Sequence, residues 1–202
     1  MKIISIHIFS LYKEKPIILS SAFALSFVSI LQRRTLKEFA NFHSRLVIER
    51  LQKGAMTEVK LEQGICYAIS QVEKIGCTII CDEEYPKRIA IELLIKIVDN
   101  FKDFLAKEKI DLNSIEKDTD VKFDYLKNTI IEWQDPSKKD NIMILQDHLI
   151  ELNNIMKQKQ NLNELLKRGE NLENLMEKSE DLKASSVNFY KYAKKTNRCC
   201  KL

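Results

Sequence analysis

The 202-residue sequence contains only 4 glycines and 3 prolines. Average usage of roughly 7% Gly and 5% Pro would give about 24 such residues in a chain of this length. This scarcity argues against a turn-rich β-sandwich or barrel, a collagen-like chain and a flexible low-complexity chain. We therefore expect long helices joined by short loops, in a chain long enough to bury a sizeable core.

The sequence also lacks an apolar run of the roughly 18 residues that a transmembrane helix needs. The nearest candidate, residues 17–31, has 15 residues and contains four serines. Glu14 and Pro16 precede it, so we interpret it as a buried strand and its connection rather than as a targeting segment. Any membrane attachment must then use another device.

The five cysteines follow neither a disulfide framework nor the Cys-x-x-Cys pairs of a zinc ribbon. A reduced chain is the simpler interpretation. Cys77 and Cys81 could share one side of a strand, but His7, His43 and His148 belong to different elements, which favours buried thiols over a metal site.

Catalytic signatures are absent as well. The sequence has no Gly-rich phosphate loop, no nucleophile elbow and no spaced carboxylate pair in the context of a pocket. We therefore predict no enzyme and no cofactor; an enzyme that uses Cys77 or Cys81 remains a distant alternative. The net charge of +4 is too small to make nucleic acid the expected partner.

Residues 1–135 have the pattern of an α+β domain. Five β-rich runs, at 1–12, 17–21, 57–61, 64–72 and 76–81, are separated by short polar breaks and predict an antiparallel sheet. A helix begins at Thr35, which with Glu38 forms a capping-box pattern, and ends before Gly54. A longer helix follows Pro86, and an amphipathic stretch spans 121–133, which makes two or three helices.

Residues 136–140 are expected to form a linker, because Pro136 cannot continue a helix. Residues 141–198 mix leucine with charge, as a long exposed helix or coiled coil does. A seam with alternating steps of four and three runs through Leu165, Arg168, Leu172, Leu175, Ser179, Leu182, Ser186, Phe189 and Ala193. Such a helix cannot bury its seam alone.

Arg168 occupies a seam position between Leu165 and Leu172. A guanidinium buried among leucines costs several kcal/mol unless its donors are all bonded. Polar residues in a seam are best known as devices that fix register and partner number. From periodicity alone, a surface arginine on a stripe displaced by one residue is equally compatible with the pattern.

At these residues the sequence resembles a known family. The stretch from Leu165 to Leu175, with its continuation through Phe189 and Tyr190, closely resembles the SNARE motif of R-SNAREs, with Arg168 at the ionic zero layer. Upstream, Glu38-Phe39, Glu49-Arg50, Lys53-Gly54 and residues 82–90 resemble a longin domain, a profilin-like fold. With its terminal cysteines, the chain resembles the R-SNARE that carries a lipid anchor in place of a transmembrane helix.

This resemblance implies a parallel four-helix bundle with Q-SNARE helices, in which Arg168 donates to three glutamines and the other seam residues form layers. One departure concerns the start of the seam. There the expected layer positions hold Asn161, Gln158 and Asn154, whereas Leu145, Leu149, Leu152 and Met156 form a stripe out of register. We expect weak or shifted assembly in that half.

The tail, Cys199-Cys200-Lys201-Leu202, satisfies the C-a-a-X pattern with Cys199 as the prenyl acceptor, and the terminal Leu favours geranylgeranyl over farnesyl. A pair of free cysteines on a frayed end is the alternative. The family usually has three residues after its two cysteines and this chain has two, so trimming of the last three residues would remove Cys200. A second lipid on Cys200 is expected only if that residue is retained. Basic residues before the tail would add to membrane binding.

The resemblance also implies a closed form in which the SNARE region and the lipid fold back on the longin domain. Phe39, Phe42 and Leu46 are the expected docking surface, although Phe42 could instead complete the longin core. The predicted function is intracellular membrane fusion by a protein that cycles between the cytosol and Golgi, endoplasmic reticulum, endosomal or vesicle membranes. The alternative is a longin adaptor that recruits coat or tethering factors.

Overall fold

A computed structural model describes residues 2–62, 64–138 and 160–199 of the chain. Its centre is a sheet with the strand order β2-β1-β5-β4-β3-β6, in which β6 is the short strand Gln160–Asn161. Five strands pair with one another in antiparallel fashion: β1 (Ile3–Ser10), β2 (Ile17–Phe23), β3 (Met56–Leu61), β4 (Gly64–Ser70) and β5 (Ile75–Cys81). These are the five strands that the β-rich runs predicted.

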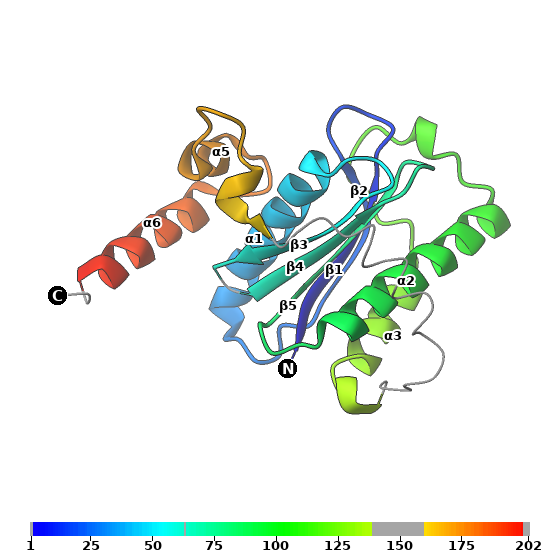
Figure 1. Ribbon diagram of the computed structural model, residues 1–202, viewed down its shortest axis with the longest axis horizontal. Helices are drawn as coiled ribbons and strands as arrows, with labels where there is room; N and C mark the ends of the chain where they lie inside the picture. The colour runs from blue at the N-terminus through cyan, green and yellow to red at the C-terminus, as the bar shows by residue number, and fades with distance from the viewer. Residues whose placement is uncertain (1, 63, 139–159, 200–202) are drawn as a thin grey trace.

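The helices cover both faces of this sheet (Figure 1). One face carries α1 (Ile30–Arg50), and the other carries α2 (Lys87–Glu108) and α3 (Tyr125–Glu132). Short 3₁₀ turns, η1 (Leu112–Ser114) and η2 (Pro136–Lys138), follow α2 and α3. The α+β class is confirmed.

Alternating side chains of the interior strand β1 contribute to both apolar layers. Ile6 and Ile8 pack in the cluster under α2 and α3, while Phe9 packs in the cluster under α1. The period-2 alternation of a strand explains why one sequence run serves both layers. Helix α1 lies so close to β5 that a Cβ at Gly76 would stand 2.7 Å from the side chain of Ile48.

The start of α1 differs from the prediction. The helix begins at Ile30 with Ser29 as its N-cap residue, and no side chain caps it. Thr35 is therefore inside the helix, and the expected capping box with Glu38 is wrong. Glu38 instead bonds to a distant part of the chain, as described below.

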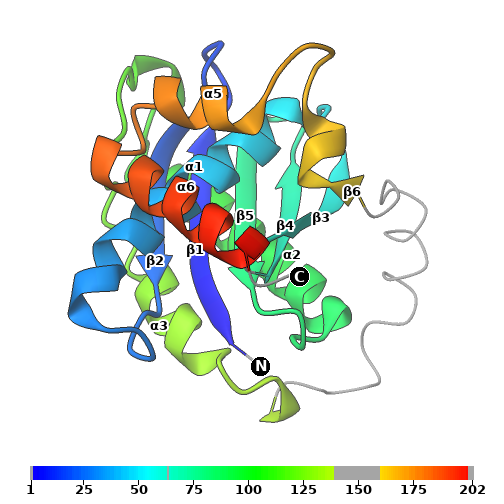
Figure 2. The same ribbon diagram turned by 90° about the vertical axis from the view of Figure 1, so that its left-hand side faces the viewer.

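The last part of the chain also differs from the expected single helix. Residues 160–199, called the C-terminal segment from here on, contain β6 (Gln160–Asn161), η3 (Leu162–Leu165), α5 (Leu172–Lys178) and α6 (Ala184–Cys199). Figure 2 shows α5 and α6 lying across α1. The predicted linker and helix between residues 139 and 159 lie outside the described residues.

Candidate functional site

The C-terminal segment contacts the domain first through backbone pairing. Strand β6 joins the edge of β3 in parallel, with Gln160 opposite Val59 and Asn161 opposite Lys60. This places η3 beside the end of α1 and directs the following chain across that helix. The sixth strand of the sheet is thus supplied by the segment itself.

Apolar side chains form the larger part of the contact. Phe39, Phe42 and Leu46 of α1 are buried in one cluster with residues of the sheet and of the C-terminal segment. The buried members from the segment are Leu162, Met176, Leu182 and Val187. Burying a side chain of this size contributes about 1.5–3 kcal/mol, so the contact supplies substantial stabilisation.

A buried arginine connects three parts of the chain. The Arg45 guanidinium, on a residue only 6% exposed, donates to Asp181 at 2.8 and 2.9 Å and to Asp118 at 2.6 and 3.2 Å. It also donates to the carbonyl oxygen of Pro16. Burial alone would lower the pKa of Arg45, but the two carboxylates outweigh this effect and raise the pKa above its ordinary value.

Two further contacts join α1 to the C-terminal segment. Arg50 donates to both carboxylate oxygens of Glu170, at 3.0 and 3.2 Å. Glu38 accepts from the backbone N–H of Lys183 at 3.0 Å and from the Ser186 hydroxyl at 2.8 Å. These charge-assisted hydrogen bonds fix the position of the chain just before α5, through Glu170, and at the start of α6, through Lys183 and Ser186.

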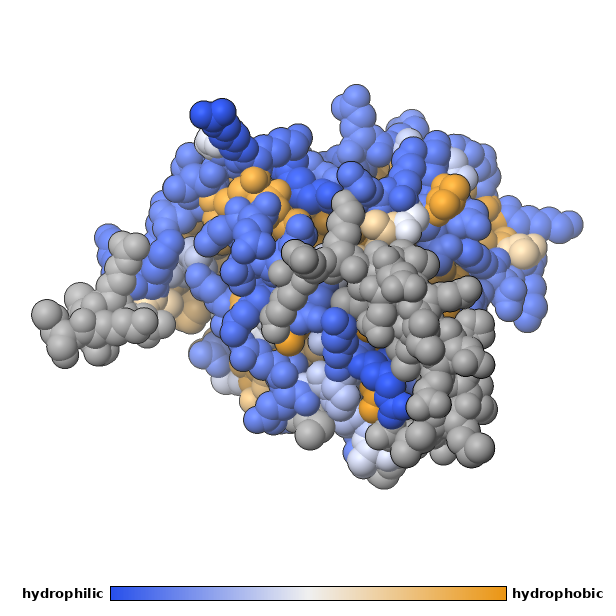
Figure 3. All heavy atoms as spheres, in the orientation of Figure 1, coloured by the Kyte–Doolittle hydropathy of each residue, from blue (hydrophilic) through white to orange (hydrophobic). Residues whose placement is uncertain are grey.

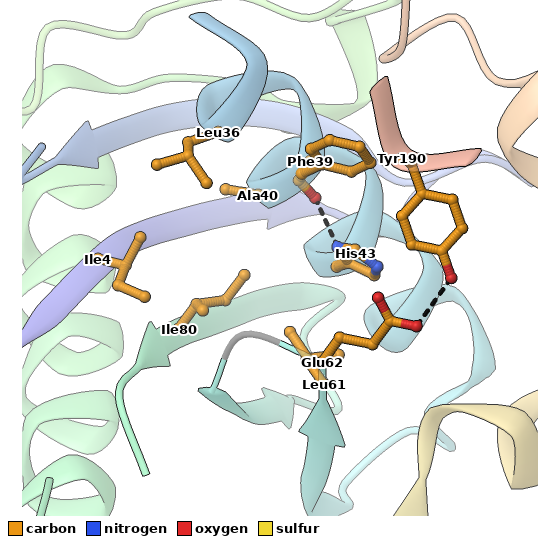
Figure 4. A pocket seen from close by; sticks show the side chains of 9 residues that line it. All are labelled: Ile4, Leu36, Phe39, Ala40, His43, Leu61, Glu62, Ile80 and Tyr190. Carbon is orange, nitrogen blue, oxygen red and sulfur yellow. Dashed lines mark hydrogen bonds between the residues drawn. The ribbon is translucent and has the colours of Figure 1, made fainter. Parts of the chain in front are cut away.

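A small pocket lies where α6 meets α1 and the sheet (Figure 4). Its walls include Phe39 and His43 of α1, and Tyr190 of α6 closes one side by donating to Glu62 at 2.9 Å. His43 donates through Nδ1 to the Phe39 carbonyl at 2.9 Å, and burial lowers the pKa of His43 to about 4. Burial and the Glu62 carboxylate raise the pKa of Tyr190. The pocket is therefore lined by uncharged rings and aliphatic chains, apart from Glu62.

A wider apolar groove continues from this pocket. It shares Ile4, Leu36 and Phe39 with the pocket and extends to Phe27, Leu31 and Phe189, with a volume of about 530 Å³. Leu31 and Phe189 are exposed, at 90% and 51%. The first turns of α1 and the middle of α6 therefore present an apolar surface to solvent.

Comparisons with known proteins bear directly on both halves of the chain. The family model for the regulated-SNARE-like (longin) domain matches residues 25–127, and the synaptobrevin family model matches residues 141–201. Synaptobrevin homolog YKT6 of Debaryomyces hansenii is 36% identical over 200 residues, which cover 99% of this chain and 98% of the relative. The homologue of Saccharomyces cerevisiae is 35% identical and that of Schizosaccharomyces pombe 32%, with the same coverage.

The chain belongs to the longin-domain R-SNAREs. Its activity is therefore in vesicle-mediated membrane fusion, and the adaptor alternative is not favoured. The C-terminal segment is part of its SNARE motif, and the site described above is a contact between this motif and the longin domain. In the described part of this R-SNARE, no helix is long and apolar enough to cross a membrane.

Arg168, the predicted zero-layer residue, lies outside the contact. Arg168 is exposed in the turn between η3 and α5, where Gly169 has a φ of 86° and no atom within 4 Å of a built Cβ. The turn reverses the chain at the point where the bundle would need a continuous helix. In this structure Arg168 therefore does not occupy a buried layer, and its zero-layer role stays a prediction.

The predicted layer residues are used unevenly in this state. Leu182 and Ser186 are buried, whereas Phe189 is exposed. The remaining layer residues are half-buried, namely Leu165, Leu172, Leu175, Ser179 and Ala193. An apolar patch in the region of η3 and α5 shows on the face drawn in Figure 3. The seam is only partly covered by the longin domain.

The predicted lipidation residues follow from the end of α6. Cys199 is the last residue of that helix, and Cys200 lies outside the described residues. The early seam positions Asn154 and Gln158, and the stripe from Leu145 to Met156, also lie outside them. Asn161 is described, in β6.

The internal cysteines have a structural role. Cys66, Cys77 and Cys81 are free and buried, and burial raises the pKa of each thiol. Thiols held in the neutral form are poor nucleophiles and poor metal ligands. Among the described residues, no group of His, Cys, Asp and Glu could hold a metal ion.

Sequence reasoning missed the polar part of this contact. Arg45 lies between Phe42 and Leu46 on the buried stripe of α1. A buried positive charge in that position indicates that a carboxylate elsewhere in the chain must pair with it. The sequence does not identify Asp181 as that partner, because Asp181 is 136 residues from Arg45 and its sequence context is that of an exposed, charged helix. Met176 and Val187 were missed because they lie outside the seam.

Proposed function

We propose that this R-SNARE is held in an inactive, closed form by its own longin domain and is released to assemble with three Q-SNARE helices. The supporting observation is that the longin domain buries Leu182 and Ser186 and half-buries most other layer residues. One surface cannot pack against α1 and line a four-helix bundle at the same time. The two states therefore exclude each other, and the closed form lowers the rate of assembly.

Assembly would convert the C-terminal segment into a continuous helix. The turns at Gly169 and between α5 and α6 would have to straighten, and Arg168 would move from solvent into the centre of the bundle. Its five N–H donors match three glutamine carbonyls, one from each partner helix. Coupled folding and binding of the seam would supply the free energy that draws two membranes together.

We also propose that Cys199 carries a prenyl group, which anchors the protein to the membrane in the open form. In the closed form an exposed prenyl chain would be costly in water. The apolar groove beside Phe27, Leu31 and Phe189 lies next to α6, the helix that ends in Cys199. A lipid held in that groove would let the protein cycle between the cytosol and Golgi, endoplasmic reticulum, endosomal or vesicle membranes.

Mixing the full chain with candidate Q-SNAREs tests this function. We expect a heat-resistant complex of four helices that forms faster with Phe42→Glu, because that substitution places a carboxylate in the cluster beneath the C-terminal segment. The complex formed by Arg168→Leu should be less stable, since each buried amide without a donor costs about 1–3 kcal/mol.

The two variants test different parts of the proposal. Unchanged assembly rate and unchanged hydrodynamic radius in folded Phe42→Glu would overturn the closed form. Equal stability and unchanged partner choice for Arg168→Leu would remove Arg168 from the zero layer. Loss of cooperative melting in Phe42→Glu would instead assign Phe42 to the longin core, and Met176→Ala would then take its place in the assay.

A further inference from the structure

Strand β2 forms the border of the sheet opposite β6. In its register with β1, Phe23 faces Ser5, Ala22 faces Ile6 and Ser21 faces His7. The backbone N–H of Ala24 bonds to the carbonyl of Ile4. Hydrogen-bonded and non-bonded pairs alternate along an antiparallel ladder, so the N–H and C=O groups of Ser21 and Phe23 point away from β1.

The first half of this border is covered by the chain itself. The backbone N–H groups of Thr119 and Val121 bond to the carbonyls of Ile18 and Leu19, each at 2.9 Å. The chain then turns away at Lys122, which has a φ of 52°. Within the described ranges, no hydrogen bond covers the outward groups of Ser21 and Phe23.

These open groups lie in a groove of about 820 Å³ between the start of α1 and α3. Figure 2 shows β2 at the border of the sheet, with the first turns of α1 in front of it and α3 behind. Because α1 and α3 flank the strand, a guest would have to enter as an extended chain. An open strand edge of this kind binds extended peptides by adding a strand to the sheet.

The charge of the groove has one sign. Lys2, Arg33, Lys37 and Lys127 line it, and none of its lining residues is acidic. Lys2 and Lys37 lie over the rings of Phe27 and Phe23, at 4.8 and 5.3 Å. Lys127 also pairs with Asp124 on the exposed side of α3, at 2.9 Å.

The groove also offers apolar positions beside its charges. Phe27 is 47% exposed and Ile131 is 73% exposed. In a strand, alternate side chains point to opposite faces, so one face of a guest strand would meet α1 and the other would meet α3. Acidic side chains suit the cationic walls, and apolar side chains suit Phe27 and Ile131.

We propose that this groove binds an extended acidic segment of a partner protein, which adds to β2 as a further strand beside Ser21 and Phe23. Apart from Phe27, which also lines the apolar groove beside α6, the surface is separate from the contact with the C-terminal segment, so a partner could bind the closed and the open R-SNARE alike. Positive charge around the groove would accelerate the encounter, and the strand edge would supply the register.

The test uses the full chain and a fluorescent ten-residue peptide that alternates Glu with Val. A matched peptide with Lys in place of Glu probes the role of charge. A Glu–Val peptide with N-methylated amides probes the role of backbone pairing. We expect the Glu–Val peptide alone to bind, and hydrogen exchange at Ser21 and Phe23 to slow by at least tenfold. Exchange at Ala22, whose N–H faces β1, should not change.

Charge reversal and edge blocking separate the two parts of the site. Lys37→Glu should weaken binding at least tenfold at low salt, whereas Lys107→Glu, an equal change of charge on the exposed end of α2, should weaken it less than twofold. Ser21→Pro removes an outward N–H and leaves the β1 ladder intact, so it should also abolish binding. All three variants should retain cooperative melting and Q-SNARE assembly.

Several results would overturn the proposal. Equal binding of the N-methylated peptide would show that charge alone attracts the probe. Equal weakening by Lys37→Glu and Lys107→Glu would show that the groove is not the site. Binding of Cys199→Ser protein to vesicles with phosphatidylserine, lost in Lys37→Glu and without any peptide binding, would assign the surface to a membrane instead.

Discussion

At the scale of single residues, Arg45 determines how the closed form is held. A buried guanidinium is costly unless its donors are bonded, and here they reach two carboxylates and a carbonyl oxygen. Asp118 belongs to the longin domain, whereas Asp181 arrives with the C-terminal segment. Opening the protein removes one of the two counter-charges, so this contact favours the closed form more than an exposed ion pair would.

Asp181→Asn should therefore open the protein. The variant keeps the size of the side chain but removes its charge, and hydrogen bonds to a charged group contribute about 1.5–3 kcal/mol. A loss of about 2 kcal/mol corresponds to a roughly thirtyfold rise in the open population. Hydrogen exchange in α5 and α6 should accelerate by that factor, with exchange in the longin strands unchanged.

The neighbouring residue provides the control for this prediction. Glu180 pairs with Lys15 at 2.6 Å, but both side chains are largely exposed. Glu180→Gln changes the net charge by the same amount and should leave the exchange rates of α5 and α6 unchanged. Equal effects of the two substitutions would show that overall charge, rather than the buried contact, controls opening.

A second residue-scale prediction concerns His7. It is fully buried, with Nε2 2.9 Å from Asn41 Oδ1 and Nδ1 3.1 Å from the Ser44 hydroxyl, and burial lowers its pKa from 6.5 to about 4. Between these two pH values the unfolded chain binds the proton and the folded chain does not. The contribution of His7 to the free energy of unfolding should therefore fall as pH drops from 6.5 to 4, by about 1.4 kcal/mol per pH unit.

Denaturant unfolding at several pH values measures this slope. His7→Gln removes the titrating group, so its stability should depend less steeply on pH in the same window, even where the variant is less stable overall. His43 contributes in the same direction, because burial also lowers its pKa to about 4. An unchanged slope in His7→Gln would show that other groups cause the acid sensitivity.

At the scale of elements, the closed form and the bundle use different sides of α5. Met176 is 1% exposed against the longin domain but lies outside the seam, whereas its neighbour Leu175 lies in the seam and is half-buried. Residues one apart on a helix point about 100° away from each other. Each state can therefore be weakened without weakening the other in equal measure.

Met176→Ala and Leu175→Ala test this separation of surfaces. Removing a buried methionine side chain costs about 2–5 kcal/mol, so Met176→Ala should accelerate Q-SNARE assembly and leave the melting temperature of the finished complex unchanged. Leu175→Ala should lower that melting temperature. The idea fails if the two variants change both rate and melting temperature by the same amounts.

At the scale of the whole molecule, the sequence predicted the longin part well and the SNARE part incompletely. The β-rich runs and the pattern after Pro86 specify their elements locally, which is why five strands and α2 were predicted close to their bounds. The seam from Leu165 to Ala193 specifies only that a partner surface is needed. Periodicity does not say whether that surface is formed by three other helices or by α1 of the same chain. When the segment packs on α1, its expected single helix is divided into η3, α5 and α6.

The position of the tail gives the last prediction. In the closed form Lys191 pairs with Glu177, and Lys194 pairs with Glu173 at 2.7 Å. Both lysines are part of the basic stretch expected to bind anionic lipid. Unfolding of the α5–α6 contact would separate these pairs, free the lysines and, under the proposal, release the prenyl chain from the apolar groove in one step, so membrane binding should follow opening.

Cys199→Ser should therefore move the protein into the soluble fraction, even when it is combined with Met176→Ala to open the closed form. The lysines alone contribute only about 1 kcal/mol each near an anionic surface. Cys200→Ser should have a smaller effect if trimming after prenylation removes that residue. Mass spectrometry of the mature C-terminus measures the modification directly. An unmodified chain that ends in Leu202 on the membrane would contradict the lipid anchor and leave the basic stretch and the longin surface as the means of attachment.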